Sequence, residues 1–410
     1  MVLRLSSSLQ PSLSRKPQRI QALKHVVRYH DYLRFATPGG TGRIPLNNPN
    51  VIGVESIRGE RGHLEDFYSF VSLSLDPEEL RHSLKKAHNR DWDPSALPES
   101  LARQVLFVGV YDGHGGSTVS QFLRQELHGL FENVDKSQIP ELKAWAQEIG
   151  GYFKRWRGGV LTPWIRPNSP EAKEPLDLEA RATLAFFEVD RLLYHEKEAK
   201  ECGATASVVL LQSLDNPPAP FFASRQLALT VAHVGDTRVI LCTTDGQAAP
   251  LTENHHADAR VEAARLRKMM GSSLFTDSFG ETRWMGVLAN TRSLGDLKFK
   301  AFGVTSEPQV NYMLLDGPAC SHITLCSDGV SSVLSDPEIA DLARGAPTPR
   351  AAAQRIVAFA EDMGSEDNAT AIVVPLNGWG NIQGEDRTRE LREYRRKQME
   401  GNERQKDRWM

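Results

Sequence analysis

The chain has 410 residues, of which 40% are hydrophobic and 25% are charged, a composition typical of a soluble globular protein. Its formal net charge of -3 gives no electrostatic reason to expect a nucleic-acid partner, and no apolar stretch approaches the roughly 20 residues that cross a bilayer. The four scattered cysteines form no CxxC motif and indicate reduced core residues rather than a disulfide framework or a zinc site: Cys202, Cys242, Cys320 and Cys326.

The first 36 residues differ in composition from the rest of the chain. They are basic and rich in serine, and no acidic residue precedes Asp31. A mitochondrial transit peptide has this composition, whereas a secretory signal would need a longer apolar stretch. A disordered basic tail of a cytoplasmic protein is the alternative. We therefore expect residues 1–36 to direct the protein to mitochondria, to the matrix or the intermembrane space, and residues 37–52 to form a Gly/Pro/Asn-rich linker.

Strand-like apolar runs alternate with amphipathic helical patterns from the end of this linker to about Leu376. The predicted strands begin at Val105, Ala206, Leu227, Thr237, His322 and Ala369, and the predicted helices at Ser117, Leu178, Ala257 and Pro349. Gly235 and Asp236 stand between two runs of matched length, which predicts a tight antiparallel hairpin. Strand pairs with helices before and after them favour two sheets packed together and covered by helices, an α+β layered domain.

Three further segments look like insertions or loops, near residues 85, 157 and 213. The stretch 379–410 is densely charged with both signs, which is typical of a solvated helix or a frayed tail.

Several predicted strands end or begin beside an aspartate that has glycine or asparagine next to it. These residues are Asp112, Asp236, Asp328 and Asp367, and Glu65 and Asp66 stand near the start of the domain. Any one of these sites alone is typical of an ordinary turn. Because interior strands of one sheet system converge, however, the acids would meet in one pocket and repel each other. A divalent cation removes this repulsion, and carboxylates, carbonyls and water are the ligands of magnesium or manganese.

The segment VLFVGVYDGHGG (105–116) indicates what such a site would do. Gly113 and Gly115 let the backbone bend and expose a carbonyl as a metal ligand. Asp112 can then bridge two ions, and His114 is free to act as a proton donor. A metal pair about 3.5–4 Å apart would hold a bridging water as hydroxide for an in-line displacement at phosphorus. Arg61 is suited to bind the phosphoryl oxygens bidentately, although RGERGHLED by itself is typical of a charged loop.

The chain contains, in this order, the motifs RGERGHLEDFY, VYDGHGG, ECGATASVV, AHVGDTRVIL, LANTRSLGDLKFK, LCSDGV and EDNATAIVV. This ordered set resembles the metal-dependent serine/threonine protein phosphatases of type 2C over about Gly53 to Leu376. The resemblance implies a four-layer α-β-β-α sandwich of two antiparallel sheets flanked by helices, in a catalytic domain at residues 53–378. It also implies a phosphoprotein phosphatase with two Mg²⁺ or Mn²⁺ ions per active site and a third, weaker one. We expect a monomer that acts on phosphorylated proteins.

The roles of individual residues follow from the same resemblance. It implies these direct metal ligands: Asp112, Asp328, Asp367 and the carbonyl of Gly113. Glu65 and Asp66 would act partly through metal-bound water, and Asp236 would bind the third ion. His114 resembles the general acid that protonates the leaving serine or threonine oxygen, and Arg61 the phosphate-binding arginine. Thr205 lies near the third-metal site in the family, whereas Asp296 is expected to support the structure rather than bind metal.

Two segments depart from the family pattern. Ser331 and Ser332 stand in SDGVSSVLSD where many members have tryptophan and aspartate, which bears on the affinity for the third ion and not on the central pair. The flap GSSLFTDSFGETRWMGV is idiosyncratic, so substrate choice does not carry over. A pseudophosphatase scaffold and a hydrolase of small phosphoesters are the alternatives. The complete set of acids for the central pair argues against the first, and the exposed flap against the second.

Overall fold

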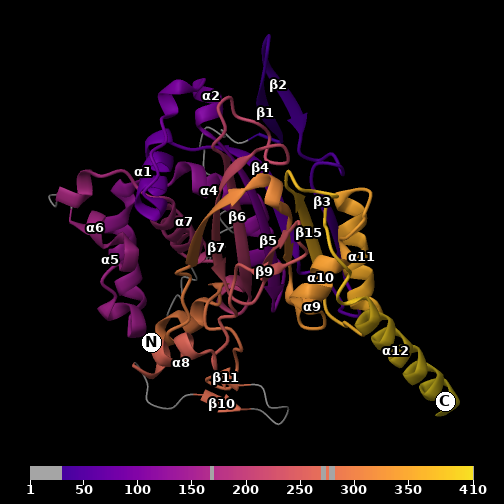
Figure 1. The fold of residues 1–410 in the computed structure, drawn as a ribbon. Helices are drawn as coiled ribbons and strands as arrows, with labels where there is room; N and C mark the ends of the chain where they lie inside the picture. Colours follow the sequence, from indigo (N-terminus) through magenta and orange to yellow (C-terminus); the bar gives the residue numbers. More distant parts are fainter. Residues whose placement is uncertain (1–29, 167–169, 269–273, 277–281, 410) are drawn as a thin grey trace, which may run out of the picture.

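The computed structural model describes residues 30–166, 170–268, 274–276 and 282–409. Two antiparallel sheets lie at its centre, and helices cover the outer face of each (Figure 1). One sheet has the strand order β13 (Gln309–Asp316), β7 (Gln226–Val234), β6 (Gly203–Ser213), β5 (Gln104–His114) and β4 (Phe67–Ser74), with β12 (Leu294–Gly295) paired to β6. The other has the order β3 (Gly53–Ile57), β15 (Ala369–Pro375), β14 (Cys320–Cys326), β8 (Arg238–Thr243) and β9 (Ala248–Pro250). The predicted α-β-β-α sandwich is confirmed.

The central strands are apolar throughout because both of their faces are buried. Neighbouring residues of a strand point to opposite faces of the sheet. In β5, Leu106, Val108 and Val110 face the core between the two sheets, whereas Val105 and Phe107 face the helices. A strand covered on both sides requires such an unbroken apolar run, and each run predicted to be a strand is one.

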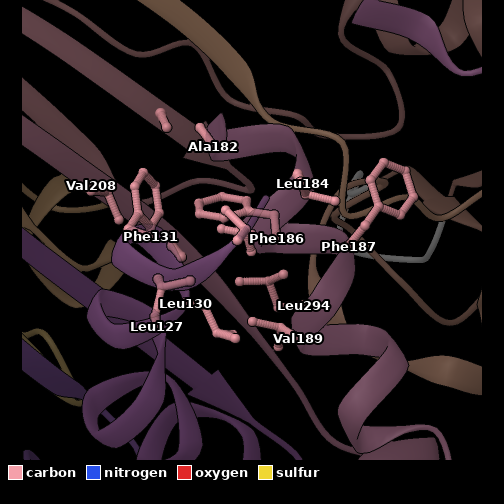
Figure 2. Close-up of a cluster of buried hydrophobic side chains, with 14 of the residues drawn as sticks. Leu127, Leu130, Phe131, Ala182, Leu184, Phe186, Phe187, Val189, Val208 and Leu294 are labelled. Carbon is pink, nitrogen blue, oxygen red and sulfur yellow. The ribbon is translucent and has the colours of Figure 1, made fainter. Parts of the chain in front are cut away.

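The helices that cover the outer face of the six-stranded sheet include α3 (Thr118–Phe122), α4 (His128–Asn133), α5 (Ile139–Ile149) and α7 (Leu178–Leu193). Figure 2 shows Phe131 of α4 and Phe186 of α7 beside Val208 of β6. The two rings meet edge to face with their centroids 6.1 Å apart, a favoured aromatic geometry. Asp177 begins α7 by accepting a hydrogen bond from the Ala180 N–H. The helices predicted from residues 117 and 178 are therefore confirmed.

Helices α9 (Asp328–Ser331), α10 (Asp336–Leu342) and α11 (Pro349–Asp362) cover the outer face of the five-stranded sheet. The helix predicted from residue 349 is confirmed as α11, and Thr348 caps it with Pro349 in its first turn. The charged C-terminal stretch forms α12 (Arg389–Trp409), which extends away from the sandwich beside α11 (Figure 1). An ion pair of 2.7 Å between Arg395 and Glu338 ties α12 to α10.

At Gly53, β3 passes close to the start of α11, and Gly53→Ala is expected to destabilise the protein. A Cβ at this position would lie 2.0 Å from the carbonyl carbon of Pro349, which is backbone that cannot move aside. We expect the free energy of unfolding to fall by about 1–3 kcal/mol, measured by urea denaturation. Gly39→Ala is the matched control, because nothing lies within 4 Å of its added Cβ. Equal unfolding midpoints for the two variants would contradict this account of the β3–α11 contact.

The predicted hairpin through Gly235 and Asp236 is wrong. Strand β7 pairs with β6 and β13, whereas β8 pairs with β14 and β9 in the opposite sheet. Gly235 has a φ of 97°, and a Cβ there would lie 2.2 Å from the Thr205 side chain, so the chain crosses between the sheets in a sharp turn. Two apolar runs joined by a short turn fit a crossing as well as a hairpin, so run lengths could not distinguish them.

The start of the described chain differs from the expected linker. Residues 32–45 form an antiparallel hairpin of β1 (Tyr32–Thr37) and β2 (Gly40–Pro45). Leu33 and Leu46 are buried in the core between the sheets, which gives the hairpin an apolar anchor. Strand structure therefore begins inside the segment 1–36. The rest of the expected transit peptide, residues 1–29, lies outside the described residues.

The segments expected as insertions contain several short helices. They include the end of α1 (Pro77–His88), α2 (Glu99–Ala102) and α6 (Thr162–Ile165). Trp164 of α6 is buried in the core cluster that covers the outer face of the six-stranded sheet. The helix predicted from residue 257 is α8 (Arg260–Arg267), which lies at one end of the sandwich with the short hairpin of β10 (Leu274–Thr276) and β11 (Thr282–Trp284) (Figure 1).

The four cysteines are free and buried, as predicted. Among the helices of the described residues, none is both long enough and apolar enough to cross a membrane.

Candidate metal centre

A cavity of about 720 Å³ opens at the end of the sandwich where β5, the β7–β8 crossing and the start of α9 meet. It brings together eight of the nine predicted site residues: Arg61, Glu65, Asp112, Gly113, His114, Asp236, Asp328 and Asp367. Thr205, Ser331 and Ser332 also line it. Both sheets contribute to it, because Asp112 lies near the end of β5 in the six-stranded sheet, whereas Asp328 follows β14 of the five-stranded sheet. The cavity is therefore a product of the sandwich and not of any one motif.

Three carboxylates converge at the floor of this cavity. Asp112, Asp236 and Asp328 each offer an oxygen atom, and these atoms lie within 4.8 Å of one another. The backbone N–H of Asp328 donates to Oδ2 of Asp112 at 3.2 Å, which joins the end of β5 to the first residue of α9. The three residues are more than 90 positions apart along the chain in each case, so the fold alone brings them together.

The electrostatics of the cluster favour a bound cation. Burial, followed by the nearby carboxylates of Asp328, Asp66 and Asp236, holds the pKa of Asp112 well above its ordinary value. Burial and the Asp236 carboxylate raise the pKa of Asp328 to about 7. Acids in this position either take up protons or are neutralised by a positive ion. The donors are oxygen atoms, with no cysteine or histidine among the three converging residues, which fits Mg²⁺ or Mn²⁺ and not zinc.

Gly113 lets β5 pass close to the segment that carries Glu65. A Cβ on Gly113 would lie 2.5 Å from the Glu65 carbonyl oxygen and 2.6 Å from Oγ of Ser120. The Ser120 hydroxyl donates to the same Glu65 carbonyl at 2.7 Å. A glycine is required at this point of close approach, which is a second reason for the glycine beside Asp112.

Asp236 differs from its two neighbours because it has neutralising partners. Nε2 of His256 lies 3.2 Å from its Oδ2, and Nδ2 of Asn290 donates to the same atom at 2.8 Å. Burial opposes the charged form, but these hydrogen bonds outweigh it, so the pKa of Asp236 is lowered. Neither His256 nor Asn290 was predicted as a site residue from the sequence. The histidine pair in LTENHHADAR was the available signal, but nothing in the sequence connects it to Asp236.

Asp66 is the predicted site residue that lies outside the cavity. It is 2% exposed, and the Ser327 hydroxyl donates to its Oδ2 at 2.6 Å, just below the floor. Burial raises the pKa of Asp66 to about 6. Asp66 therefore adds negative charge beneath the three carboxylates without facing the cavity itself.

Arg61 lies at the mouth of the cavity with 62% of its side chain exposed. Its Nη2 donates to Oδ2 of Asp367 at 2.6 Å. Asn368, which the sequence analysis also missed, holds the arginine loop in place: its Oδ1 accepts from the Glu65 N–H at 2.6 Å, and its Nδ2 donates to the His63 carbonyl at 3.1 Å. The N-terminal arginine motif and the start of β15 are thus joined into one wall.

His114 lines the cavity and contacts Asp296. Its Nε2 lies 2.9 Å from Oδ2 of that aspartate. Burial disfavours the imidazolium, but the charge of Asp296 and the hydrogen bond to it outweigh burial, so the pKa of His114 is raised. Asp296 was expected to support the structure rather than bind metal, and its contact is with His114.

Comparison with known proteins identifies relatives of this chain. Residues 76–369 match the family model described as protein phosphatase 2C. The chain is 32% identical over 376 residues to protein phosphatase 2C homolog 4 of Schizosaccharomyces pombe, which covers 89% of this chain and 91% of the relative. It is 29% identical over 286 residues to "Protein phosphatase 1K, mitochondrial" of Xenopus laevis, covering 68% of this chain and 63% of the relative.

Solved structures show the same fold. The crystal structure of serine-threonine phosphatase 2C from Toxoplasma gondii matches with a TM-score of 0.52 at 17% identity, covering 79% of this chain and 94% of that chain. A sex determining protein of C. elegans matches with a TM-score of 0.52 at 19% identity, covering 80% and 65%. At these identities the structural matches speak for the fold alone.

Proposed function

Since this chain belongs to the protein phosphatase 2C family and is therefore a metal-dependent phosphoprotein phosphatase, we propose that it hydrolyses phosphoserine and phosphothreonine in proteins at the cavity described above. The convergence of Asp112, Asp236 and Asp328 within 4.8 Å is the observation that carries the proposal. Arg61 and His114 line the same cavity and supply the remaining chemistry.

The ligands proposed for two Mg²⁺ or Mn²⁺ ions are Asp112, Asp328, Asp367 and the carbonyl of Gly113. Glu65 contributes through water, Asp66 adds negative charge from below the floor of the cavity, and Asp236 serves a third, weaker ion. Ser332 lines the cavity in place of a carboxylate, which supports the weaker third site. When bound, the ions would supply a hydroxide nucleophile at neutral pH and positive charge for the phosphoryl oxygens.

Arg61 and His114 act on the substrate itself. The guanidinium of Arg61 binds two phosphoryl oxygens, and the exposure of its side chain at the mouth leaves it free to exchange Asp367 for the phosphate. As the bond between water oxygen and phosphorus forms, the bond from phosphorus to the serine or threonine oxygen breaks. His114 gives a proton to that leaving oxygen, and the products are the free hydroxyl and inorganic phosphate.

The proposed preference for proteins over small phosphoesters rests on the wall of the cavity formed by residues 287–290. Val287 is 51% exposed at this wall, beside Leu288 and Ala289, and offers apolar surface that a peptide can cover. In the presence of Mn²⁺, we expect kcat/KM for a phosphoserine peptide to be at least about tenfold higher than kcat/KM for a small metabolite phosphate. A tenfold ratio corresponds to about 1.4 kcal/mol of additional binding of the transition state. Parallel assays of released phosphate measure the ratio. A ratio below one would favour the small-phosphoester hydrolase, and activity that survives a chelator would contradict the whole proposal.

We also propose a mitochondrial location for the protein. The N-terminal composition supports it, and one relative is named as mitochondrial. Residues 1–36 fused to a fluorescent protein are expected to carry it into mitochondria, visible by microscopy. A matched fusion with Arg4, Arg15, Lys16 and Arg19 replaced by glutamine should remain diffuse in the cytoplasm. Diffuse fluorescence from the unaltered fusion would contradict the location.

A further inference from the structure

Asp296 is held against His114 in a backbone conformation that residues other than glycine rarely adopt. Its φ of 49° and ψ of 37° lie in the left-handed region, which is unfavourable for a residue with a Cβ. The Asp296 side chain is 2% exposed, and its Oδ2 lies 2.9 Å from Nε2 of His114. Strain of this kind persists where surrounding structure compels it, and it gathers at functional sites.

Gly203 makes the contact between the two side chains sterically feasible. It pairs with His114 of β5 on one side and with Gly295 of β12 on the other. A Cβ on Gly203 would lie 2.4 Å from Oδ2 of Asp296 and 2.8 Å from Nε2 of His114. The glycine of ECGATASVV thus clears the space in which histidine and carboxylate meet.

A buried layer below fixes the position of the carboxylate. The Ser293 hydroxyl donates to Oδ2 of Asp296 at 2.6 Å. Lys300 and Asp190 form an ion pair of 2.8 Å with side chains 1% and 2% exposed. Nζ of Lys300 donates to the Ser293 carbonyl at 2.6 Å, and Oδ1 of Asp190 accepts from the Gly295 N–H at 2.9 Å. Ser293 and Gly295, which both precede Asp296 in the chain, are therefore tied to one buried pair.

We propose that Asp296 is a positioning residue for the phosphatase reaction. It engages Nε2 of His114 and so leaves Nδ1 as the ring nitrogen that donates a proton to the leaving oxygen. Asp296 does not belong to the group of three carboxylates that converge for metal binding, which separates its role from theirs. The inference rests on the proposed role of His114 as general acid.

The test compares two substrates that differ in their need for an acid. A phosphoserine peptide releases an alkoxide and needs a proton on the leaving oxygen, whereas p-nitrophenyl phosphate releases a stable phenolate. With Mn²⁺ present, kcat of Asp296→Asn for the peptide should fall on the order of 10²-fold, and for p-nitrophenyl phosphate by less than about threefold. Asp341→Asn is the matched control, since Asp341 is a buried aspartate of α10 that pairs with Arg344 away from the cavity. It should change both rates equally.

His114→Ala distinguishes failure of this inference from failure of the proposed function. It should show the same difference between the two substrates. The double variant with His114→Ala and Asp296→Asn should lose no more peptide activity than His114→Ala alone, because Asp296 acts only through His114. Multiplicative losses in the double variant would overturn the positioning role. If His114→Ala lowers both rates equally, His114 is not the general acid, and the inference falls with that assignment. If only Asp296→Asn lowers both equally, the inference alone is wrong.

A second variant and a spectroscopic measurement remain decisive if Asp296→Asn does not fold. Ser293→Ala removes one hydrogen bond to the carboxylate and should produce a smaller loss of about 3–10-fold on the peptide substrate only, roughly the worth of one hydrogen bond. In ¹⁵N NMR of the metal-free protein labelled at histidine, Nε2 of His114 should shift in Ser293→Ala and not in Asp341→Asn. Equal losses on both substrates, or an unchanged Nε2 resonance, would overturn the proposal.

Discussion

Asp112→Asn is expected to abolish phosphatase activity while leaving the metal-free protein at least as stable as the wild type. The side chain keeps its shape but loses the charge that would hold the ions, and paired ions stabilise the transition state by several kcal/mol. We therefore expect kcat/KM to fall about 10³-fold or more. Stability should move the other way, because burial and three neighbouring carboxylates raise the pKa of Asp112 in the folded state. A carboxyl whose folded pKa is raised destabilises the folded protein at every pH above its ordinary pKa of 3.8, so the neutral amide removes a cost at neutral pH.

Two thermal denaturation series check this prediction, one with a chelator and one with increasing Mn²⁺. In the chelator, the Tm of Asp112→Asn should equal or exceed that of the wild type. Added Mn²⁺ should raise the Tm of the wild type in proportion to the logarithm of its concentration and leave the variant unchanged. Asp341→Asn should behave in the opposite way, with lower Tm, retained activity and a normal response to Mn²⁺. An active Asp112→Asn enzyme would contradict the assignment of the metal centre.

Glu262→Gln is expected to cost about 3–5 kcal/mol of stability, because it breaks a buried charge cluster. The Glu262 side chain is 1% exposed, with Oε2 2.7 Å from Nη2 of Arg265 and Oε1 2.7 Å from Nη2 of Arg292. Thr291 also donates to Oε2 at 2.7 Å. Loss of the carboxylate charge leaves two largely buried guanidinium groups without the anion that both of them contact. The cluster joins α8 to the segment that follows the flap, so the end of the sandwich near the cavity should loosen first.

The same carboxylate gives the stability a defined pH dependence. Burial opposes its charge, but Arg292 and Arg265 outweigh burial and lower the pKa of Glu262 to about 2 from an ordinary value of 4.5. The stabilisation is therefore complete above pH 4.5 and is lost as the pH falls toward 2. Urea midpoints measured at several pH values should show the difference between wild type and Glu262→Gln shrinking across this range. Glu78→Gln is the matched control, because Glu78 forms an exposed pair with Arg81 worth less than about 1 kcal/mol. A constant difference across the range would contradict the role of the Glu262 charge.

Local structure was largely predictable because it depends on neighbours in the chain. The unbroken run 105–111 predicts a strand buried on both faces, and β5 is one. The helix predicted from residue 349 begins there, with a threonine cap and a proline in its first turn. The recurrence of aspartates beside strands, together with the ordered motifs, predicted which acids would meet, and the structure places Asp112, Asp236 and Asp328 together.

Arrangements that depend on distant contacts were not predictable in this way. The turn at Gly235 gives the same local pattern whether β8 returns to its own sheet or crosses to the other. Asp66 and Glu65 are neighbours in the chain, yet one lies below the floor of the cavity and the other lines it. His256 and Asn290 reach Asp236 from segments far from it in the chain, and nothing in the sequence indicates that they meet it.

The sequence by itself determined the family, the two-sheet class of fold and the identity of the acids, because strand periodicity and ordered motifs are properties of short segments. Only the tertiary structure decided which partner each of those side chains meets. Asp296 shows the reason: its contact with His114 requires a left-handed backbone, a glycine in a neighbouring strand and a buried ion pair 2.8 Å long beneath it. These elements are distant in the chain, and their geometry exists only once the sandwich has closed around them.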